Sequence, residues 1–569
     1  MLNEMSMKKN IVVNLSLILF SIITIPFLLD LIELNFRIVF ISFIGNVIII
    51  FLIAIMILDV IFLIIKKQNV YFLTVLSMYL SLILFLIMIY SFLNNTYKIV
   101  YVMNYSNNSL PLVYKIVAIW AGEEGSIMTW MLFNSITINL YRIGNRNKED
   151  LVFIRSVILS SIISTAFLII LLYLNPFELQ SSSPSDGLGL NPILISPFMI
   201  WHPFFTFIAY AVYLVPFTIT ISEIITRKSK LKESFQIKFY NFTLKFGWLV
   251  LTLSIGLGAY WAKIALTWGR YWGWDPVETV SLIPWFFITA FFHTIIFKKK
   301  NPLLIKINVA LIFSSIVFST LITRGGGLTS LHAFTGGAEL VIWVVILGSV
   351  LIFLPLYVIY IVLDYLMEEY RNKKLLFDYL SYLFLYGLAF VCIFGLYIPP
   401  ITFLLSILIP INTIHIGPDF FIITTLILAT GLGLSLIFCS LWEYFEVKKI
   451  GLYITIAIFI QSVLSFILLV VINIWINPVL IIFMISFLSS MFRLGKNFKI
   501  SRGAVFFFRL NSKTIIHAGI SLILAGFLMP SNFQDMFFIP GFVLLLIGIV
   551  PSIISSFFLK KNEKKIINN

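Results

Sequence analysis

Long apolar stretches separated by short polar connections run through the chain. Sixteen of them approach or exceed the roughly 20 residues that a helix needs to cross a bilayer. They cover residues 11–30, 38–65, 70–93, 122–141, 151–173, 201–226, 243–264, 281–297, 303–323, 338–363, 378–398, 419–441, 451–474, 477–492, 514–530 and 537–559. The two stretches that meet at Asn477-Pro478 also fit one re-entrant hairpin. The pattern predicts an all-α polytopic membrane protein with about 14–16 transmembrane helices.

Basic residues form short clusters on alternate connections. The clusters lie at residues 8–9, 66–67, 142–148, 227–232, 298–300, 371–374, 448–449, 493–513 and 560–565. Because cytoplasmic loops carry an excess of Lys and Arg, this alternation predicts a cell-membrane protein with both termini in the cytoplasm. The longer connections then face outwards, at residues 94–121, 174–200, 265–280, 324–337 and 399–418.

Composition supports the membrane assignment and excludes several other classes. Of 569 residues, 60% are hydrophobic and only 11% are charged, too few polar groups for a soluble protein of this length. The net charge of +15 follows the topology pattern, so no nucleic-acid partner is expected. Cys392 and Cys439 lie in separate apolar runs, which excludes a Cys-x-x-Cys redox motif or haem c site. No cleavable signal peptide is expected, because Lys8 and Lys9 precede a span that leads into further spans.

Aromatic residues are concentrated in one segment, residues 261–285, which we call the aromatic segment. Its members are Trp261, Trp268, Tyr271, Trp272, Trp274 and Trp285. An interfacial belt scatters single aromatic residues over many helix ends, whereas here they lie beside the carboxylates of Asp275 and Glu278. We therefore predict a surface for a flat aromatic ligand at the outer face. The plainer alternatives are an interfacial anchor for the tryptophans, and helix capping or loop bracing for the two carboxylates.

The chain has only five histidines, and two of them are expected at the depth of the aromatic segment. His202 lies at the outer start of the 201–226 span, and His332 lies in the 324–337 connection. One precedes the aromatic segment and the other follows it. They are candidates for axial ligands above and below a ring that lies on the aromatic side chains. A helix cap and an ordinary loop residue, respectively, are the alternatives.

A second pair, His293 and His517, is expected inside the membrane. His293 lies five residues before Lys298, and His517 lies four residues after Lys513. At 1.5 Å per residue, both imidazoles are roughly 6–8 Å inside the cytoplasmic boundary. Two imidazoles at one depth on different helices suit a b-type haem held between them. Hydrogen bonding of each histidine to a neighbour is the alternative. His415 has no partner at its depth and is interpreted as a surface loop residue.

These residues resemble a known family. The pattern Trp268-Gly-x-x-Trp272-x-Trp274-Asp275-Pro-Val-Glu278 looks like the tryptophan-rich "WWD" signature of haem-handling proteins in cytochrome c maturation. Within that superfamily the chain resembles the large CcmF/NrfE haem lyase branch. Further stretches that resemble the family, in the family's order, are residues 114–126, 190–203, 323–334, 416–421 and 517–519.

The resemblance implies a holocytochrome c synthase-type haem lyase, which forms thioether bonds. Haem b would bind between His293 and His517, and a second haem, the substrate, would lie on a Trp-rich platform of the external loops, flanked by His202 and His332. Residues with positioning roles on that platform would be Trp268, Trp272, Trp274, Asp275 and Glu278. The family receives haem from a chaperone (CcmE-like) and joins its vinyl groups to the Cys-x-x-Cys-His thiols of apocytochrome c. Thiol reductase subunits (CcmH/CcmI-like) are candidate partners, and quinol is a candidate reductant.

Two arginines are candidates for the propionates of the outer haem. Arg270 and Arg324 are both expected near the outer face, where a guanidinium can pair with a carboxylate in bidentate fashion. Contact with lipid headgroups is the alternative for both. No nucleophile is needed from the chain itself, because the thiol and the vinyl group both belong to substrates.

The chain departs from the family pattern at two places. Tyr271 and Gly273 stand where the family usually shows Trp and Phe. The connection between the last two spans runs only from about Pro530 to Met536, where bacterial relatives carry a soluble outer domain. Docking of partner proteins is therefore expected to differ.

The functional division expected from these features has three parts: N-terminal transmembrane helices (1–110), a haem-handling core (111–340) and a C-terminal bundle that supplies the second inner ligand (341–569). Two alternative functions stay open. A haem transporter or exporter of the WWD family would share the aromatic segment, but would leave the pair His293 and His517 without a role. A quinol-linked membrane b-type cytochrome would use that pair and leave the aromatic segment idle.

Overall fold

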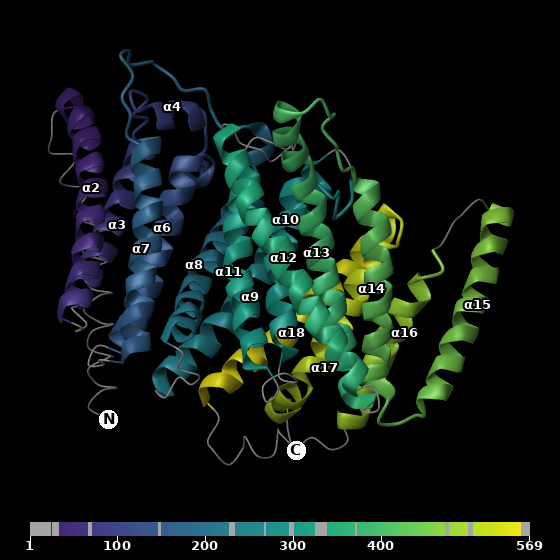
Figure 1. The fold of residues 1–569 in the computed structure, drawn as a ribbon. Helices are drawn as coiled ribbons and strands as arrows, with labels where there is room; N and C mark the ends of the chain where they lie inside the picture. Colours follow the sequence, from purple (N-terminus) through teal and green to yellow (C-terminus); the bar gives the residue numbers. More distant parts are fainter. Residues whose placement is uncertain are drawn as a thin grey trace. The chain divides into compact units, whose positions relative to one another are not determined.

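The computed structural model describes residues 24, 34–66, 71–145, 150–226, 234–266, 269–294, 301–324, 338–369, 373–472, 477–498 and 504–558. The chain divides into two compact units, residues 1–250 and residues 251–569, and each is described separately below. The described residues are mostly helical, and they contain no named β-strand, only one isolated bridge between Ile99 and Leu179. The ribbon is shown in Figure 1.

Unit 1 is a group of long helices that pack side by side. They are α2 (Leu34–Lys66), α3 (Tyr71–Leu93), α6 (Glu123–Ile143), α7 (Leu151–Leu174) and α8 (Pro197–Thr226), and α9 (Ser234–Ala265) begins here and ends in unit 2. Helix α2 packs against α3 and α7, and α6 packs against α3, α7 and α8. Helix α7 packs against α2, α6 and α8, so α6 and α7 each contact three of the other long helices of this unit.

Polar side chains join the helices in the interior of unit 1. Arg142 of α6 and Asp59 of α2 form an ion pair of 2.6 Å with side chains 0% and 3% exposed. Ser161 of α7 donates a second hydrogen bond to the same Asp59 oxygen at 3.1 Å. Since a buried charge is tolerated only when it is paired and hydrogen-bonded, these contacts fix α2, α6 and α7 to one another.

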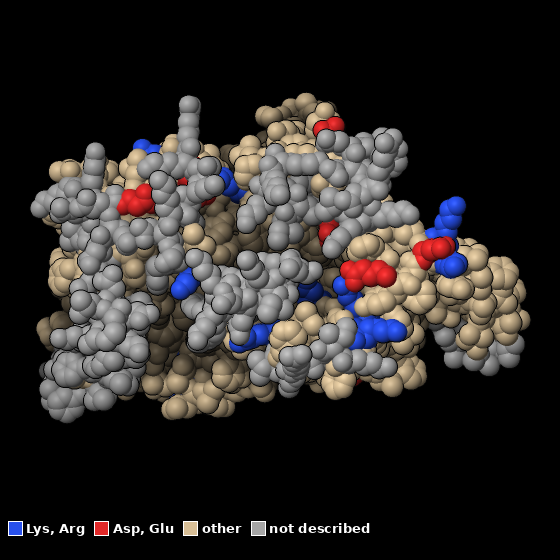
Figure 2. Space-filling model, turned by 90° about the horizontal axis from the view of Figure 1, so that it is seen from below, with Lys and Arg blue, Asp and Glu red and all other residues tan. Residues whose placement is uncertain are grey.

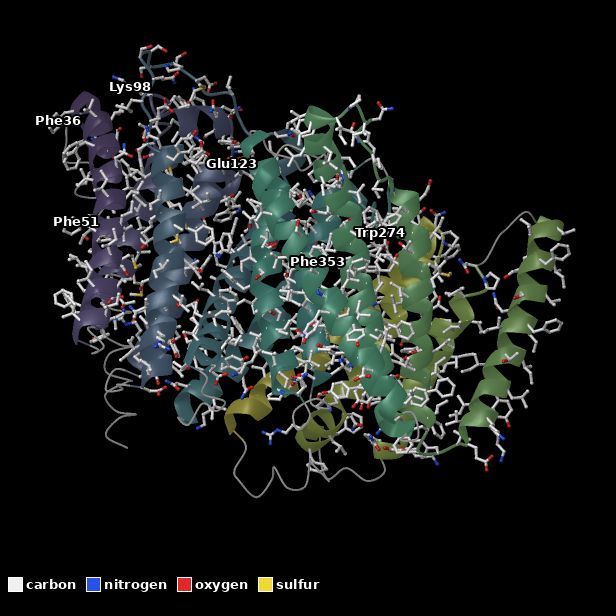
Figure 3. The ribbon with its side chains drawn as sticks, in the orientation of Figure 1. Phe36, Phe51, Lys98, Glu123, Trp274 and Phe353 are labelled. Carbon is white, nitrogen blue, oxygen red and sulfur yellow. The ribbon has the colours of Figure 1, made fainter. Side chains whose placement is uncertain are left out.

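The two long connections of unit 1 pair with each other at one end of the helices. They contain the short helices α4 (Val100–Tyr105) and α5 (Leu112–Val117), which the sequence did not predict. The amide of Val100 donates to the carbonyl of Glu178 at 2.9 Å, and that of Leu188 donates to Met103 at 2.8 Å. Both connections therefore lie on the same side, together with Lys98, above the helix start where Glu123 lies (Figure 3). We call this the predicted outer end of unit 1.

Unit 2 contains the remaining helices. They are α10 (Pro276–Phe291), α11 (Pro302–Arg324), α12 (Ala338–Glu369), α13 (Lys373–Leu408), α14 (Pro418–Leu441), α15 (Val447–Ile472), α16 (Leu480–Phe498), α17 (Ala504–Phe527) and α18 (Gln534–Phe558). Successive helices pack against one another from α10 to α14, α10 also packs against α13, and α16 packs against both α14 and α17.

Helices α17 and α18 approach each other through glycines. A Cβ atom added at Gly519 would lie 2.6 Å from the carbonyl oxygen of Gly541 and 2.7 Å from the amide nitrogen of Leu545. A Cβ at Gly548 would in turn lie 2.9 Å from the carbonyl oxygen of Ser512. Small residues at such positions let helix backbones come close in a membrane, where van der Waals contact drives association.

Acidic residues accompany part of the basic residues at the ends of these helices. Figure 2 shows Lys and Arg side chains, some of them with Asp or Glu beside them. Arg493 pairs with Glu443 at 3.3 Å, and Lys449 pairs with Glu446 at 3.7 Å on the exposed start of α15.

The predicted spans agree closely with the helices. Among the described residues, thirteen helices are long and apolar enough to cross a membrane, and α6 and α10 match two further predicted spans, which gives fifteen matches. The first predicted span, 11–30, lies outside the described residues. Helices α15 and α16 are separate and both long enough to span, which favours two spans over the re-entrant hairpin. The predicted start of the 399–418 connection is wrong, because α13 continues through Pro399 and Pro400 to Leu408.

Candidate functional site

The aromatic segment turns sharply between the end of α9 and the start of α10. Gly269 and Trp274 both have a left-handed backbone, with φ of 59° and 57°. Glycine adopts this conformation freely, whereas a residue with a side chain costs free energy there and needs support from its surroundings. Trp268 lies outside the described residues.

Two carboxylates supply that support. Asp275 is the N-cap of α10, and its side chain accepts a hydrogen bond from the amide of Val277 at 3.0 Å. Glu278 accepts a hydrogen bond from the amide of Gly273 at 2.8 Å. Proline at the first helical position, here Pro276, fits the same start signal. Asp275 and Glu278 thus cap the helix and brace the turn, as the plainer sequence interpretation holds.

Tyr271 and Trp272 point into the protein. They are 1% and 7% exposed and form a buried cluster with Ala259 and Phe538. The Tyr271 ring stacks on Phe538, with ring centroids 3.9 Å apart at an angle of 12°. The indole N–H of Trp272 is buried and has no acceptor among the described residues.

Trp274 connects the segment to α14 and keeps part of its surface exposed (Figure 3). Its ring is parallel to that of Phe421, with centroids 5.6 Å apart at 5°. It also meets Trp272 edge-on at 6.2 Å. Arg270 nearby is exposed. Among the described residues of the turn, Trp274 is therefore the aromatic side chain with surface to offer to a flat ligand.

The two inner histidines both belong to unit 2. His293 lies in the turn after α10 and His517 lies in α17, and both side chains are partly buried. Nδ1 of His293 lies 3.0 Å from the carbonyl oxygen of Thr289. A carbonyl only accepts, so Nδ1 carries the proton and Nε2 presents its lone pair. The contact with the carbonyl oxygen of Thr289 orients the ring, as a similar contact does in histidines that bind metals.

Basic side chains accompany His517. Lys513 lies one helical turn before it, and both Lys513 and Arg493 of α16 interact with its charge. The carbonyl of His517 accepts a hydrogen bond from Ser521 at 2.7 Å, and Ser521 in turn contacts Ser486 of α16. The ring is thus placed on a helix that α16 and α18 hold from two sides.

Of the outer histidines, the structure describes His202. It lies in the second turn of α8 in unit 1, partly exposed, and its carbonyl accepts a hydrogen bond from Thr206 at 2.8 Å. The neighbouring Trp201 is half exposed and stacks on Phe205 at 6.1 Å. His332 and the side chain of Arg324 lie outside the described residues, so their predicted roles stay predictions.

The residue set fits a haem. Among the described residues, no group of three or more His, Cys, Asp or Glu side chains could hold a bare metal ion. A haem asks less of the protein, because the porphyrin supplies four ligands and a bis-imidazole site needs two histidines. His293 and His517 are the predicted pair, and their joint ligation of one iron stays a prediction. His415, in the connection before α14, is exposed, in agreement with its interpretation as a loop residue.

Sequence reasoning missed three residues that hold the aromatic segment. Lys263, Gln534 and Asp535 contact Tyr271 from the end of α9 and the start of α18. The short last connection was a visible signal, but nothing in the sequence indicated that it meets a segment more than 250 residues earlier.

Known proteins are similar in sequence to part of this chain. The family model described as "Cytochrome C assembly protein" matches residues 120–332. The cytochrome c-type biogenesis protein NrfE of Haemophilus influenzae is 33% identical over 249 residues, 43% of this chain and 39% of the relative. CcmF of Escherichia coli strain K12 is 31% identical over 259 residues, 44% of this chain and 39% of the relative. The chain therefore spans well under half the length of these two relatives.

A solved structure agrees over a larger part of the chain. The cytochrome c haem lyase CcmF superposes with a TM-score of 0.63 and 19% identity, covering 86% of this chain and 76% of that chain. At this identity the likeness concerns the fold alone. The sequence matches and the shared fold make the chain similar to the CcmF/NrfE-type cytochrome c assembly proteins.

Proposed function

We propose that the chain is a haem lyase of cytochrome c maturation that binds haem b in the membrane and attaches a second haem to apocytochrome c on the outer face. The observation that carries this proposal is what lies at the two ends of α10. Its 16 residues begin in the aromatic segment, and His293 follows them in the next turn. At 1.5 Å per residue the helix is about 24 Å long, so one rigid element links an outer aromatic surface to an inner iron ligand.

The inner haem would be held by Nε2 of His293 and by the imidazole of His517. When bound, it supplies one-electron chemistry, and quinol is a candidate source of the electrons. The protein's own contribution is orientation. Thr289 fixes the tautomer of His293, and the packing of α16 and α18 against α17 fixes the position of His517.

The outer haem is a substrate, and the chain positions it. In the reaction a thiol adds across a vinyl group: the sulfur bonds to one vinyl carbon, a proton ends on the other carbon, and no electrons are gained or lost overall. Catalysis then rests on holding the reacting groups in register. Trp274 supplies stacking surface, Trp272 supports it edge-on, and Asp275 and Glu278 fix the turn that carries both.

The remaining site residues have supporting roles in this proposal. His202 and His332 hold the iron of the outer haem until the apocytochrome histidine displaces one of them. Trp268 extends the stacking surface, and Arg270 and Arg324 pair with propionates. A CcmE-like chaperone delivers the haem, CcmH/CcmI-like subunits present the apocytochrome, and both termini lie in the cytoplasm.

The test is haem attachment to a reporter apocytochrome c co-expressed with the full chain. The single variants His202→Ala and His332→Ala are expected to lose attachment while the inner haem spectrum stays. The matched control is His415→Ala, an exposed histidine of another predicted outer connection, which is expected to attach haem at the wild-type level. Attachment that survives in the double variant His202→Ala/His332→Ala contradicts the proposal.

The two alternative functions predict other results in the same assay. An exporter is indicated if haem reaches the outside without being attached to the reporter, and if substitution of His293 and His517 does not change this transport. A b-type spectrum with no attachment and no effect of Trp274→Ala indicates a quinol-linked cytochrome.

A further inference from the structure

The first turn of α18 holds the aromatic segment through polar contacts. Lys263, in the last turn of α9, donates to Asp535 Oδ1 at 2.6 Å. The hydroxyl of Tyr271 donates to the same oxygen, also at 2.6 Å. The amide of Tyr271 donates to Gln534 at 3.3 Å. Three parts of unit 2 meet at one carboxylate.

Tyr271 acts here as an anchor. Phe538 covers one face of its ring, and the Lys263 ammonium lies over the ring at 5.0 Å from the centroid. Because Tyr271 is only 1% exposed, its ring has no surface left for stacking on a ligand. Burial, and the Asp535 carboxylate beside it, raise the pKa of Tyr271 well above its usual value, so the hydroxyl keeps its proton and remains a donor.

The anchor is coupled to the surface that the proposed function uses. Trp272 follows Tyr271 directly and shares its buried cluster, Trp272 meets Trp274 edge-on, and Trp274 stacks on Phe421 of α14. These rings form a continuous series of contacts. A shift of the anchor therefore displaces Trp274, the ring with exposed surface.

We propose that Asp535 and Lys263 are positioning residues for haem attachment, which set the place of Trp274 by holding Tyr271. The inference rests on the proposed function. It assigns a role to the first turn of α18, which follows the short connection between the last two helices and holds the aromatic segment in place. Bacterial relatives are expected to carry a soluble domain at this connection. It also explains Tyr271, since a tryptophan at this position has no hydroxyl to offer to Asp535.

The exposure of the pair separates positioning from folding. The Asp535 side chain is 48% exposed and that of Lys263 is 15% exposed. Partly exposed ion pairs contribute little to stability because water and salt screen them. Loss of the pair is therefore expected to leave the fold intact, whereas a displacement of about 1 Å at a reacting group can cost about 100-fold in rate.

The experiment measures attachment kinetics in the full-length chain, with apocytochrome concentration varied. Asp535→Ala is expected to lower kcat at least about 10-fold with KM for apocytochrome little changed. Asp535→Glu, which restores the carboxylate, is expected to recover part of kcat. Tyr271→Phe combined with Asp535→Ala is expected to be no worse than Asp535→Ala alone, because both changes remove the same contact. The control is Glu446→Gln, which removes another ion pair of unit 2 on an exposed helix start and is expected to change nothing.

Each other outcome has a definite meaning. Unchanged kcat in Asp535→Ala, while the wild type attaches haem, overturns this inference and leaves the proposed function intact. Independent effects of Tyr271→Phe and Asp535→Ala also overturn it. A loss of folded protein with normal kcat per folded molecule shows a purely structural role and overturns it as well. A wild-type chain that attaches no haem at all removes the proposed function, and this inference with it.

Discussion

Two ion pairs of the same length lie in opposite surroundings in the two units. In unit 1, Arg142 and Asp59 meet at 2.6 Å with side chains 0% and 3% exposed. In unit 2, Lys263 and Asp535 also meet at 2.6 Å, but with side chains 15% and 48% exposed. The distance is equal, yet the free energies differ, because the buried charges have given up their hydration and depend on partners within the protein.

The two ion pairs have different roles. Breaking a buried pair leaves an uncompensated charge, so Arg142 and Asp59 hold α2 and α6 in one register. Breaking a half-exposed pair costs little stability, so the value of Lys263 and Asp535 lies in where they hold Tyr271. The same chemistry thus serves the fold in one unit and, by our proposal, the reaction in the other.

The largest effect is expected from breaking the buried pair. Asp59→Asn or Arg142→Met alone is expected to destabilise the chain by about 3–5 kcal/mol, because the remaining group is left buried without its partner. The double variant Asp59→Leu/Arg142→Met is expected to recover most of that loss. Thermal unfolding in detergent measures it, and a double variant that is as unstable as the sum of the singles contradicts the account.

A smaller effect is expected where close packing, without charge, joins two helices. Gly519→Ala places a Cβ 2.6 Å from a backbone oxygen of α18 and is expected to destabilise by about 1–3 kcal/mol. Because Gly519 lies two residues after His517, the absorption spectrum of the inner haem is expected to change as well. Gly451→Ala is the matched control, since a Cβ there meets no atom within 4 Å. Equal stabilities of the Gly519→Ala and Gly451→Ala variants exclude the packing explanation.

The half-exposed pair is expected to matter little for stability. Asp535→Asn is expected to shift the free energy of unfolding by at most about 1 kcal/mol, and less at high salt, because exposed charges are screened. The measurement is denaturation of the membrane-extracted chain at low and high ionic strength. A loss as large as that of Asp59→Asn removes the contrast between the two pairs.

The smallest effect concerns alkaline pH. The pKa of Tyr271 is raised by burial and by the Asp535 charge. The stability it contributes is therefore fully present below the ordinary tyrosine pKa of about 10 and is lost as pH rises above it. Tyr271→Phe, which cannot ionise, is expected to be slightly less stable at pH 7 and to lose less stability than the wild type above about pH 10. Unfolding curves from pH 7 to 11 test this, and parallel curves for the two proteins contradict it.

Local sequence signals predicted local structure well. Apolar length fixed the spans, because a membrane helix must satisfy its backbone internally wherever it crosses. The sequence Asp275-Pro276 indicated a helix start, and Asp275 indeed caps α10. The distances of His293 and His517 from flanking lysines predicted a common depth, and their pairing across one haem stays a prediction.

Contacts between distant segments were not predictable in this way. Tyr271 and Trp272 lie in the turn between α9 and α10, where no helical periodicity indicates which side chains are buried, so their burial had no local signal. The contact of Tyr271 with Asp535 joins residues 264 positions apart. Helix α13 continues past Pro399 and Pro400, although proline usually ends a helix, since it lacks an N–H group and clashes with the preceding turn.

The central claim is that His293 and His517 hold one haem between them, and its most direct test is the absorption spectrum of the purified full-length chain. The account predicts a bis-imidazole b-type spectrum in the wild type that is lost or converted to a five-coordinate form in either His293→Ala or His517→Ala, with His415→Ala unchanged. A b-type spectrum that persists in the double variant His293→Ala/His517→Ala contradicts it.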